Sequence, residues 1–273
     1  LSTLRDLQAR VVVEQADLGL AFDGDADRCF LIDEKGAVVD PSHLTALIAE
    51  RELARSPGAT IIYSLISSRV VPEVIESNGG IASRSKVGHS NIKAQMAQTG
   101  AIFGGEHSGH FYFKEFWNAD SGMLAALYAI SALGNSDAGR TFSSVIDKYR
   151  KYVASGEINS KVSDVKSTMA KVEAKFGGAG AIDRLDGITI SSDSWWLNVR
   201  ASNTEPLLRL NVEAKTQGEM SSVRDEVLAG GRCRLDVTGG RDVVGGDRVT
   251  QHRQDARALD VPLGGGLHRD RTP

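Results

Sequence analysis

Short apolar runs alternate with stretches of helix length between residues 38 and 150, and this alternation limits the possible folds more than any other feature of the sequence. Consecutive strands separated by helices need crossover connections, which produce parallel sheets. The predicted strands are 60–65, 81–83 and 101–103, and the predicted helices are 40–55, 70–77, 91–99 and 119–133. We therefore predict one complete α/β domain with a largely parallel sheet over residues 38–150.

The residues on either side of this domain follow different patterns. Residues 1–37 carry strand-type runs at 11–13, 18–22 and 29–32 and are predicted to be the C-terminal end of a truncated α/β domain. Since the first residue is leucine, we expect the sequence to start inside something larger. Residues 151–228 are predicted to form a small α+β domain, with helices at 165–176 and 219–228 and strands at 188–190, 195–199 and 207–214.

The segment 229–273 has no helical or strand periodicity and is rich in Gly, Arg and Asp, with no Lys or Glu. Two interpretations stay open. One is a disordered C-terminus, and the other is a change of reading frame near Leu228. We assign no function to this segment.

Composition excludes several classes of protein. The chain has 273 residues, 41% of them hydrophobic and 25% charged, as in soluble globular proteins, and a net charge of −3 gives no sign of nucleic-acid binding. The longest apolar run, 123–133, is too short to span a bilayer core of about 30 Å, so we expect a buried helix and no membrane partner. Only two cysteines, Cys29 and Cys233, are present, which favours a reducing cytoplasm.

The strongest local motif is the run Asp23-Gly24-Asp25-Ala26-Asp27-Arg28, between two strand-type runs. Three carboxylates at alternate positions of a tight loop can converge on one hard divalent cation such as Mg²⁺ or Ca²⁺. A solvated acidic turn is one alternative. A calcium-binding EF-hand loop is another, because Glu34 stands at the twelfth position, but Arg28 occupies the position that requires glycine and the flanks are not helical.

A second polar motif, Gly104-Gly105-Glu106-His107-Ser108-Gly109-His110, follows the strand at 101–103. We expect Glu106, Ser108 and His110 to project from a tight loop, where carboxylate and hydroxyl groups suit hydrogen bonding to a polyol. A metal site formed by His107, His110 and Glu106 is an alternative, and a polar surface turn is another.

Two further segments are suited to binding anions. Residues 200–206, Arg-Ala-Ser-Asn-Thr-Glu-Pro, offer many donors after a strand, as a phosphate requires, although an ordinary Asn/Ser turn would look the same. Residues 84–93, which include Lys86 and His89, precede a helix N-terminus, where backbone N–H groups favour an anion.

These four segments, in this order, resemble the α-D-phosphohexomutase family in its phosphomannomutase/phosphoglucomutase branch. The first resembles the family's metal loop (usually DGDGDR), GEHSGH its sugar-specificity loop and RASNTEP its distal phosphate loop, and KVGHSNIK matches as well; the resemblance covers about residues 10–228. The family fold has three α/β domains and a smaller α+β fourth domain. This chain would correspond to the end of domain two (1–37), domain three (38–150) and domain four (151–228).

The resemblance implies a reaction and a set of residues for it. A phosphoserine and a bisphosphate intermediate interconvert mannose or glucose 1-phosphate and 6-phosphate, with glucose 1,6-bisphosphate or a similar compound as activator. Mg²⁺ would be held by Asp23, Asp25 and Asp27, and the catalytic residues would be Arg28, His89 and His110. The residues implied for substrate binding are Lys86, Glu106, Ser108, Arg200, Ser202, Asn203, Thr204 and Arg209.

The sequence departs from the family pattern in two ways. The serine loop, typically Thr-Ala-Ser-His-Asn-Pro, is missing, so we expect the isolated chain to be inactive and a separately encoded N-terminal half to be a possible partner. A lysine common in relatives is replaced within Leu65-Ile66-Ser67, and Lys86 or Arg69 could substitute for it. The rival functions are a truncated remnant that binds sugar phosphate weakly, and a calcium-binding module.

Overall fold

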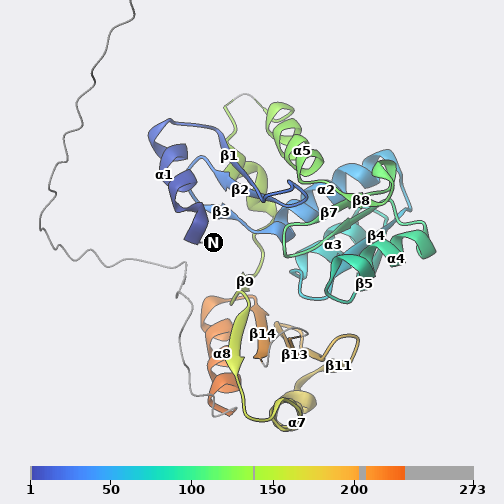
Figure 1. Ribbon diagram of the computed structural model, residues 1–273, viewed down its shortest axis with the longest axis vertical. Coiled ribbons are helices and arrows are strands. Elements are labelled where there is room, and N and C mark those ends of the chain that lie inside the picture. Colours follow the sequence, from blue (N-terminus) through green and yellow to red (C-terminus); the bar gives the residue numbers. More distant parts are fainter. Residues whose placement is uncertain (1, 138, 203–206, 231–273) are drawn as a thin grey trace, which may run out of the picture. The chain divides into compact units, whose positions relative to one another are not determined.

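A computed structural model describes residues 2–137, 139–202 and 207–230 (Figure 1). Predictions for Asn203, Thr204 and residues 231–273 therefore lie outside the described residues. No helix in the described part is long and apolar enough to cross a membrane.

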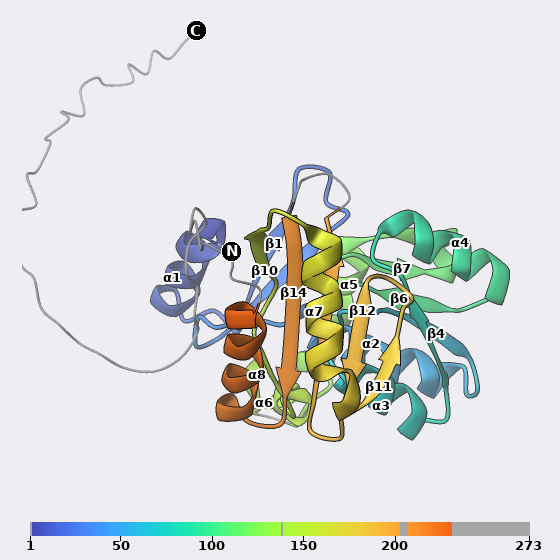
Figure 2. The ribbon, with the colours of Figure 1, turned by 90° about the horizontal axis from the view of Figure 1, so that it is seen from below.

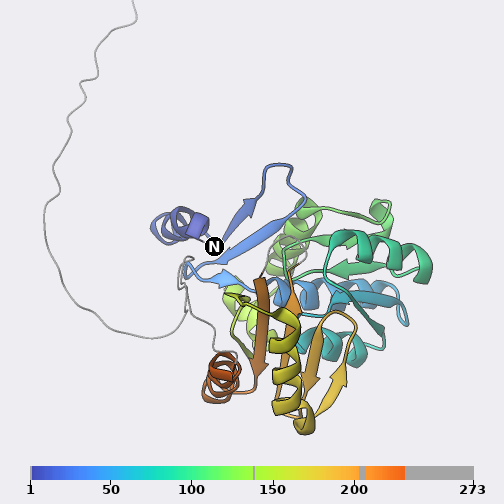
Figure 3. The same ribbon diagram turned by 60° about the horizontal axis from the view of Figure 1, so that its bottom comes forward.

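The first region is a three-stranded antiparallel sheet with a helix beside it, coloured blue in Figure 3. Its elements are α1 (Arg5–Val13), β1 (Leu18–Phe22), β2 (Cys29–Asp33) and β3 (Val38–Val39). The predicted strand at 11–13 is wrong, because these residues end α1. Leu4, Leu7 and Val11 lie at helical spacing and pack against Ile32, so burial of this apolar face stabilises the helix over a strand.

The middle region is a five-stranded sheet with strand order β5-β4-β6-β7-β8. Its strands are β4 (Thr60–Ser64), β5 (Ile81–Ser85), β6 (Phe103–Gly105), β7 (Phe111–Phe113) and β8 (Ala119–Asp120). The pairs β4–β5 and β4–β6 are parallel, as predicted, but β7 and β8 are antiparallel to their neighbours. The five residues 106–110 that join β6 to β7 are too few for a crossover, so the chain must return as a hairpin.

Helices cover both faces of this sheet. They are α2 (Pro41–Arg55), α3 (Val70–Ser77), α4 (His89–Thr99) and α5 (Gly122–Gly134), followed by the short α6 (Phe142–Ile146). Neighbouring residues of β4 point to opposite faces. Ile61 packs in the cluster that contains α2, α3 and α5, and Ile62 packs in the cluster that contains α4. Asp40 caps α2 by accepting a hydrogen bond from Ser42 N at 2.7 Å, with Pro41 at the first position, as predicted.

Helix α5 differs from its prediction in two respects. It begins three residues late, because Ala119–Asp120 forms β8 and Ser121 caps the helix through Leu124 N. It is also not fully buried. Its alanines, Ala125, Ala126, Ala129 and Ala132, face the core, while Met123, Leu127 and Ile130 on the opposite face are exposed. Composition alone could not reveal this, since both faces are apolar.

The C-terminal region is an antiparallel sheet with two helices, α7 (Val165–Phe176) and α8 (Gln217–Gly230), side by side on one face (Figure 2). The strands, in the order β10-β14-β13-β12-β11 with β9 on β14, are β9 (Val153–Ala154), β10 (Ile158–Lys161), β11 (Ala181–Asp183), β12 (Ile188–Ser191), β13 (Trp195–Ala201) and β14 (Leu207–Ala214). Trp195 packs toward Phe176 of α7, whereas Trp196 is buried with Leu65 and Ile66 of the middle region.

Candidate functional site

The acidic loop is the connection of the β1–β2 hairpin. Phe22 pairs with Cys29 at its base, and Ala26 N donates to Asp23 O at 3.2 Å to form a turn. Ala26 has φ +59°, in the left-handed region that alanine rarely adopts. Arg28 donates from Nε to Asp23 Oδ2 at 2.6 Å and from its backbone N to Asp23 Oδ1 at 3.2 Å, which fixes the first carboxylate of the loop.

The three aspartates do converge. One carboxylate oxygen from each of Asp23, Asp25 and Asp27 lies within 4.8 Å of the others. Burial raises the pKa of Asp23, but hydrogen bonds from Arg28 outweigh burial and lower this pKa to about 2. Burial, together with the charges of Asp23 and Asp25, raises the pKa of Asp27 despite the opposing effect of His110.

This loop fits a hard divalent cation. Asp27 Oδ1 is buried and has no hydrogen-bond partner among the described residues, and its carboxylate is repelled by its two neighbours. All-oxygen donors of this kind suit Mg²⁺ or Ca²⁺. Glu34, the twelfth position of the calcium alternative, instead accepts hydrogen bonds from Ser143 N at 2.9 Å and Ser143 Oγ at 2.5 Å, at the start of α6.

The second polar motif lies directly beside the acidic loop. Cys29 N donates to Gly109 O at 3.1 Å, and Arg28 forms an isolated antiparallel bridge with His110. Gly122, at the start of α5, donates to Ala26 O at 3.3 Å. A Cβ at Gly122 would lie 2.5 Å from Arg28 O, so only glycine permits this approach. The backbone thus joins two motifs that are far apart in the sequence.

Glu106 does not project from its loop, and that expectation is wrong. Glu106 is only 2% exposed. Its Oε1 accepts a hydrogen bond from Gly88 N at 2.9 Å, and its Oε2 accepts one from Tyr112 Oη at 2.7 Å. Gly104 and Gly105 belong to β6 instead of the loop. Ser108 is exposed, as expected. A short loop cannot turn every side chain outward, and a carboxylate that receives two hydrogen bonds can be buried.

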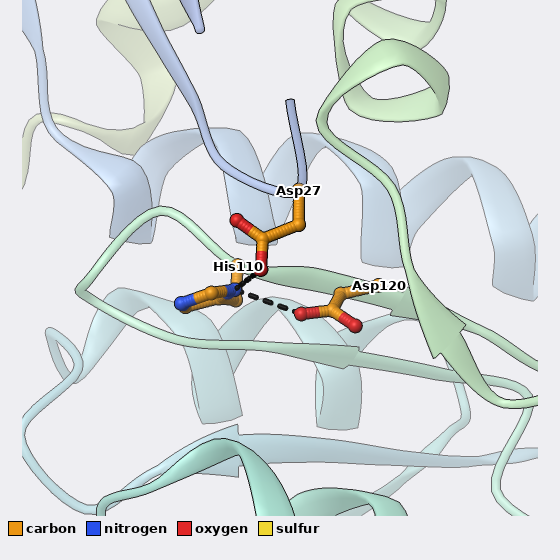
Figure 4. A group of neighbouring side chains, drawn as sticks. All are labelled: Asp27, His110 and Asp120. Atoms are coloured by element: carbon orange, nitrogen blue, oxygen red, sulfur yellow. Dashed lines mark hydrogen bonds and ion pairs between the residues drawn. The ribbon is translucent and has the colours of Figure 1, made fainter. Parts of the chain in front are cut away.

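His110 lies between two carboxylates (Figure 4). Its Nδ1 is 2.8 Å from Asp120 Oδ2 and 3.6 Å from Asp27 Oδ2. Asp27, His110 and Asp120 form a second group that could hold a metal, and neither His107 nor Glu106 joins any such group among the described residues. His107 instead has its Nδ1 3.4 Å from Ser42 Oγ and 3.6 Å from Asp40 Oδ1.

The segment 84–89, at the N-terminus of α4, lies near His110. His89 is the first residue of α4, and its ring centroid is 6.5 Å from that of His110. The side chains of Lys86 and His89 are both exposed. Arg69, the other candidate for the missing lysine, donates to Ser192 O at 2.5 Å and Trp195 O at 3.0 Å, so it is occupied with the C-terminal region.

Two arginines converge at the adjoining ends of β13 and β14. Arg200 donates to Glu157 Oε2 at 2.6 Å, and Arg209 Nη1 is 3.2 Å from Glu157 Oε1. Arg209 also donates to Ser202 Oγ at 3.2 Å. Nε of each arginine is buried without a hydrogen-bond partner in the described part of the chain. Two positive charges with one carboxylate and spare donors form a site that a phosphate can complete.

Sequence reasoning missed the partners of the predicted residues. Asp120 was assigned to a helix, and Glu157, Lys93 and Tyr112 were given no role. No motif marks them, since each acts on a residue from another element. The signal that was available was chemical, because a histidine or an arginine pair withdrawn from water needs a counter-charge.

Comparison with known proteins supports one family. The profile described as phosphoglucomutase/phosphomannomutase, alpha/beta/alpha domain III matches residues 40–152, and that of the C-terminal domain of the same family matches residues 157–230. A phosphomannomutase from Methanocaldococcus jannaschii is 42% identical over 227 residues, which are 83% of this chain and 50% of that protein.

Solved structures of mutases have the same fold as this chain. A phosphoglucomutase/phosphomannomutase family protein from Burkholderia thailandensis superposes with a TM-score of 0.75 at 30% identity, over 84% of this chain and 50% of that one. The Aspergillus fumigatus N-acetylphosphoglucosamine mutase, in complex with GlcNAc-6P and magnesium, has a TM-score of 0.56 at 16% identity, over 77% of this chain and 51% of that one, and so shares the fold. The chain spans about half the length of the curated relatives it matches.

Proposed function

Because the chain belongs to the phosphoglucomutase/phosphomannomutase family, we propose that it supplies the metal-, sugar- and phosphate-binding portion of a cytoplasmic phosphohexomutase. The reaction would interconvert the 1-phosphate and 6-phosphate of mannose or glucose through a phosphoserine and a bisphosphate. The observation that carries this proposal is the backbone junction between Cys29 and Gly109, which brings the acidic loop to the sugar loop.

Each part of the site has a chemical role in this proposal. Asp23, Asp25 and Asp27 would hold Mg²⁺, which supplies charge neutralisation for phosphoryl transfer. Arg28, fixed by Asp23, would support the transferred phosphoryl group. His110 and His89 lie near each other and would contact the reacting hydroxyl.

Substrate binding would use the loop at 106–110 for the sugar and the segment 200–206 for the phosphate. Ser108 is exposed and can donate to a sugar hydroxyl, whereas Glu106 would have to exchange one of its internal hydrogen bonds for a substrate contact. Arg69 donates to Ser192 of the C-terminal region, so the exposed Lys86 would take the place of the lysine that is common in relatives. Arg200, Arg209 and Ser202, with Asn203 and Thr204, would hold the phosphate that does not react.

The phosphoryl carrier is a separate requirement. The 273 residues contain no Thr-Ala-Ser-His-Asn-Pro segment, so another segment, such as a separately encoded N-terminal half, would have to provide the serine. A coupled assay on the chain alone, with Mg²⁺ and glucose 1,6-bisphosphate, is expected to show no turnover. Turnover by the chain alone would contradict this.

Binding can be tested without turnover. We expect mannose 6-phosphate, but not mannose, to shift the backbone NMR signals of Arg200 and Ser202 in the presence of Mg²⁺. Arg200→Met should abolish the shifts, because it removes the more deeply buried of the two cations. Arg184→Met, an exposed arginine of the same region, is the matched control and should leave them intact. The proposal fails if mannose 6-phosphate causes no shifts in the wild type, or shifts the Ser202 signal equally in Arg200→Met.

A further inference from the structure

Asp120 is the closest polar partner of His110. His110 immediately precedes β7 and Asp120 is the last residue of β8, the strand antiparallel to β7, and His110 Nδ1 lies 2.8 Å from Asp120 Oδ2 (Figure 4). The Asp120 side chain is only 8% exposed and that of His110 17% exposed. Both groups are thus withdrawn from water, and a contact of this length between them is a hydrogen bond.

The other oxygen of Asp120 is occupied as well. Lys93, on α4, has its Nζ 2.7 Å from Asp120 Oδ1. An ammonium group only donates hydrogen bonds, and an ionised carboxylate only accepts them. The lysine therefore fixes which oxygen faces the histidine, and that oxygen requires a hydrogen on Nδ1.

The histidine ring is held from a second side. The ring of Tyr112 stacks on it at 6.2 Å between centroids, and Tyr112 Oη donates to Glu106. Figure 4 shows the second ring nitrogen, Nε2, pointing away from both carboxylates. In a neutral ring with hydrogen on Nδ1, Nε2 is the acceptor.

We propose that Asp120, held by Lys93, is a positioning residue that fixes His110 as the Nδ1–H tautomer and leaves Nε2 to accept a hydrogen bond from a sugar hydroxyl. The identity of the hydroxyl rests on the proposed function. The choice of tautomer does not, because it follows from the contacts among Lys93, Asp120 and His110, with Asp27 Oδ2 farther from Nδ1, at 3.6 Å.

Asp120→Asn gives a specific test. Lys93 can only donate, so it should take the amide oxygen and turn the amide NH₂ toward His110. Nδ1 must then accept, and the hydrogen moves to Nε2. Long-range ¹H–¹⁵N spectra at about pH 9, where an ordinary imidazole is neutral, distinguish the two tautomers, and His110→Gln assigns the signals. Wild type should show Nδ1–H and Asp120→Asn should show Nε2–H. The same tautomer in both proteins would overturn the proposal.

A double variant tests the role of Lys93. In Lys93→Met/Asp120→Asn the amide is no longer oriented by an ammonium group, so the Nδ1–H form should return at least in part. A double variant with the same pure Nε2–H signal as Asp120→Asn would show that Lys93 does not act in this way. A metal bound by Asp27, His110 and Asp120 is the rival arrangement; it needs a bare Nδ1, so Nε2–H in the wild type after Mg²⁺ addition would favour it.

The two proposals can fail separately. If mannose 6-phosphate leaves wild-type signals unchanged while the tautomers behave as described, the proposed function fails and the role of Asp120 stands. If mannose 6-phosphate shifts Arg200 and Ser202 but Asp120→Asn keeps the wild-type tautomer, the role of Asp120 fails and the proposed function stands.

Discussion

The acidic loop and the arginine pair have opposite charge but the same arrangement, in which several like charges surround one opposite charge. In the β1–β2 loop, three carboxylates gather around one arginine, Arg28, which pairs with Asp23. At β13 and β14, two arginines gather around one carboxylate, Glu157. Each group keeps a surplus of one sign that a ligand of the other sign can neutralise. In each group, one residue of opposite charge therefore fixes the side chains and leaves charge for a ligand to neutralise.

The two groups differ in burial. Asp25 is exposed and Arg28 is 43% exposed in its side chain, whereas the Arg200 side chain is 5% exposed. Water screens the charge of the exposed Asp25, whereas the buried Oδ1 of Asp27 has no hydrogen-bond partner among the described residues and stays unfavourable until a cation binds. The buried guanidinium has no such screening, and its internal partner matters more for folding.

The largest expected effect on stability comes from removing the charge of Glu157, the partner of the buried Arg200. Glu157→Gln should lower the free energy of unfolding toward the lower end of the ~3–5 kcal/mol lost when a buried ion pair loses one partner, since Glu157 is itself 25% exposed. Urea denaturation measures this. Glu173→Gln, which breaks the exposed pair with Arg184, should cost about 0–1 kcal/mol. Equal losses would show that burial of the Arg200–Glu157 pair does not increase its contribution to stability.

In the acidic loop, removing a charge should stabilise the metal-free protein, in contrast to the arginine pair. Without Mg²⁺, Asp27→Asn should raise the melting temperature, because it removes a carboxylate whose pKa is raised first by burial and then by the charges of Asp23 and Asp25. With Mg²⁺ at about 100 times its Kd, wild type should gain ~2.7 kcal/mol and overtake the variant. Calorimetry with and without EDTA checks the reversal, with Asp17→Asn as an exposed control. A wild type that stays below the variant at every Mg²⁺ concentration would rule out this metal site.

The smallest expected effect concerns the backbone of the same loop. Ala26→Gly should stabilise the protein by up to about 1 kcal/mol, because Ala26 has φ +59° and glycine adopts this conformation without a steric cost. Ala9→Gly, in the exposed part of α1, should instead destabilise by about 1 kcal/mol. Urea denaturation of both variants compares them, and a loss of stability in Ala26→Gly would contradict the strained turn.

The candidate site was predictable where function resides in one short segment. The three aspartates converge because alternate residues of a tight hairpin connection cannot be far apart, so the spacing alone predicted the cluster. The same reasoning failed for Glu106, whose direction depends on Tyr112 and Gly88 from two other elements. It also failed for α5, where a run of apolar residues gave no indication of which face meets the core.

The sequence by itself determined the mixed α/β architecture, the family and the positions of the polar loops, because periodicity and loop spacing act over a few residues. Only the tertiary structure decided which groups oppose one another. Glu157 and Arg200 are 43 positions apart, and His110 meets Asp120 across a strand pair. Such contacts form only after the sheets are assembled, since strand register sets which side chains of distant segments come within hydrogen-bond distance.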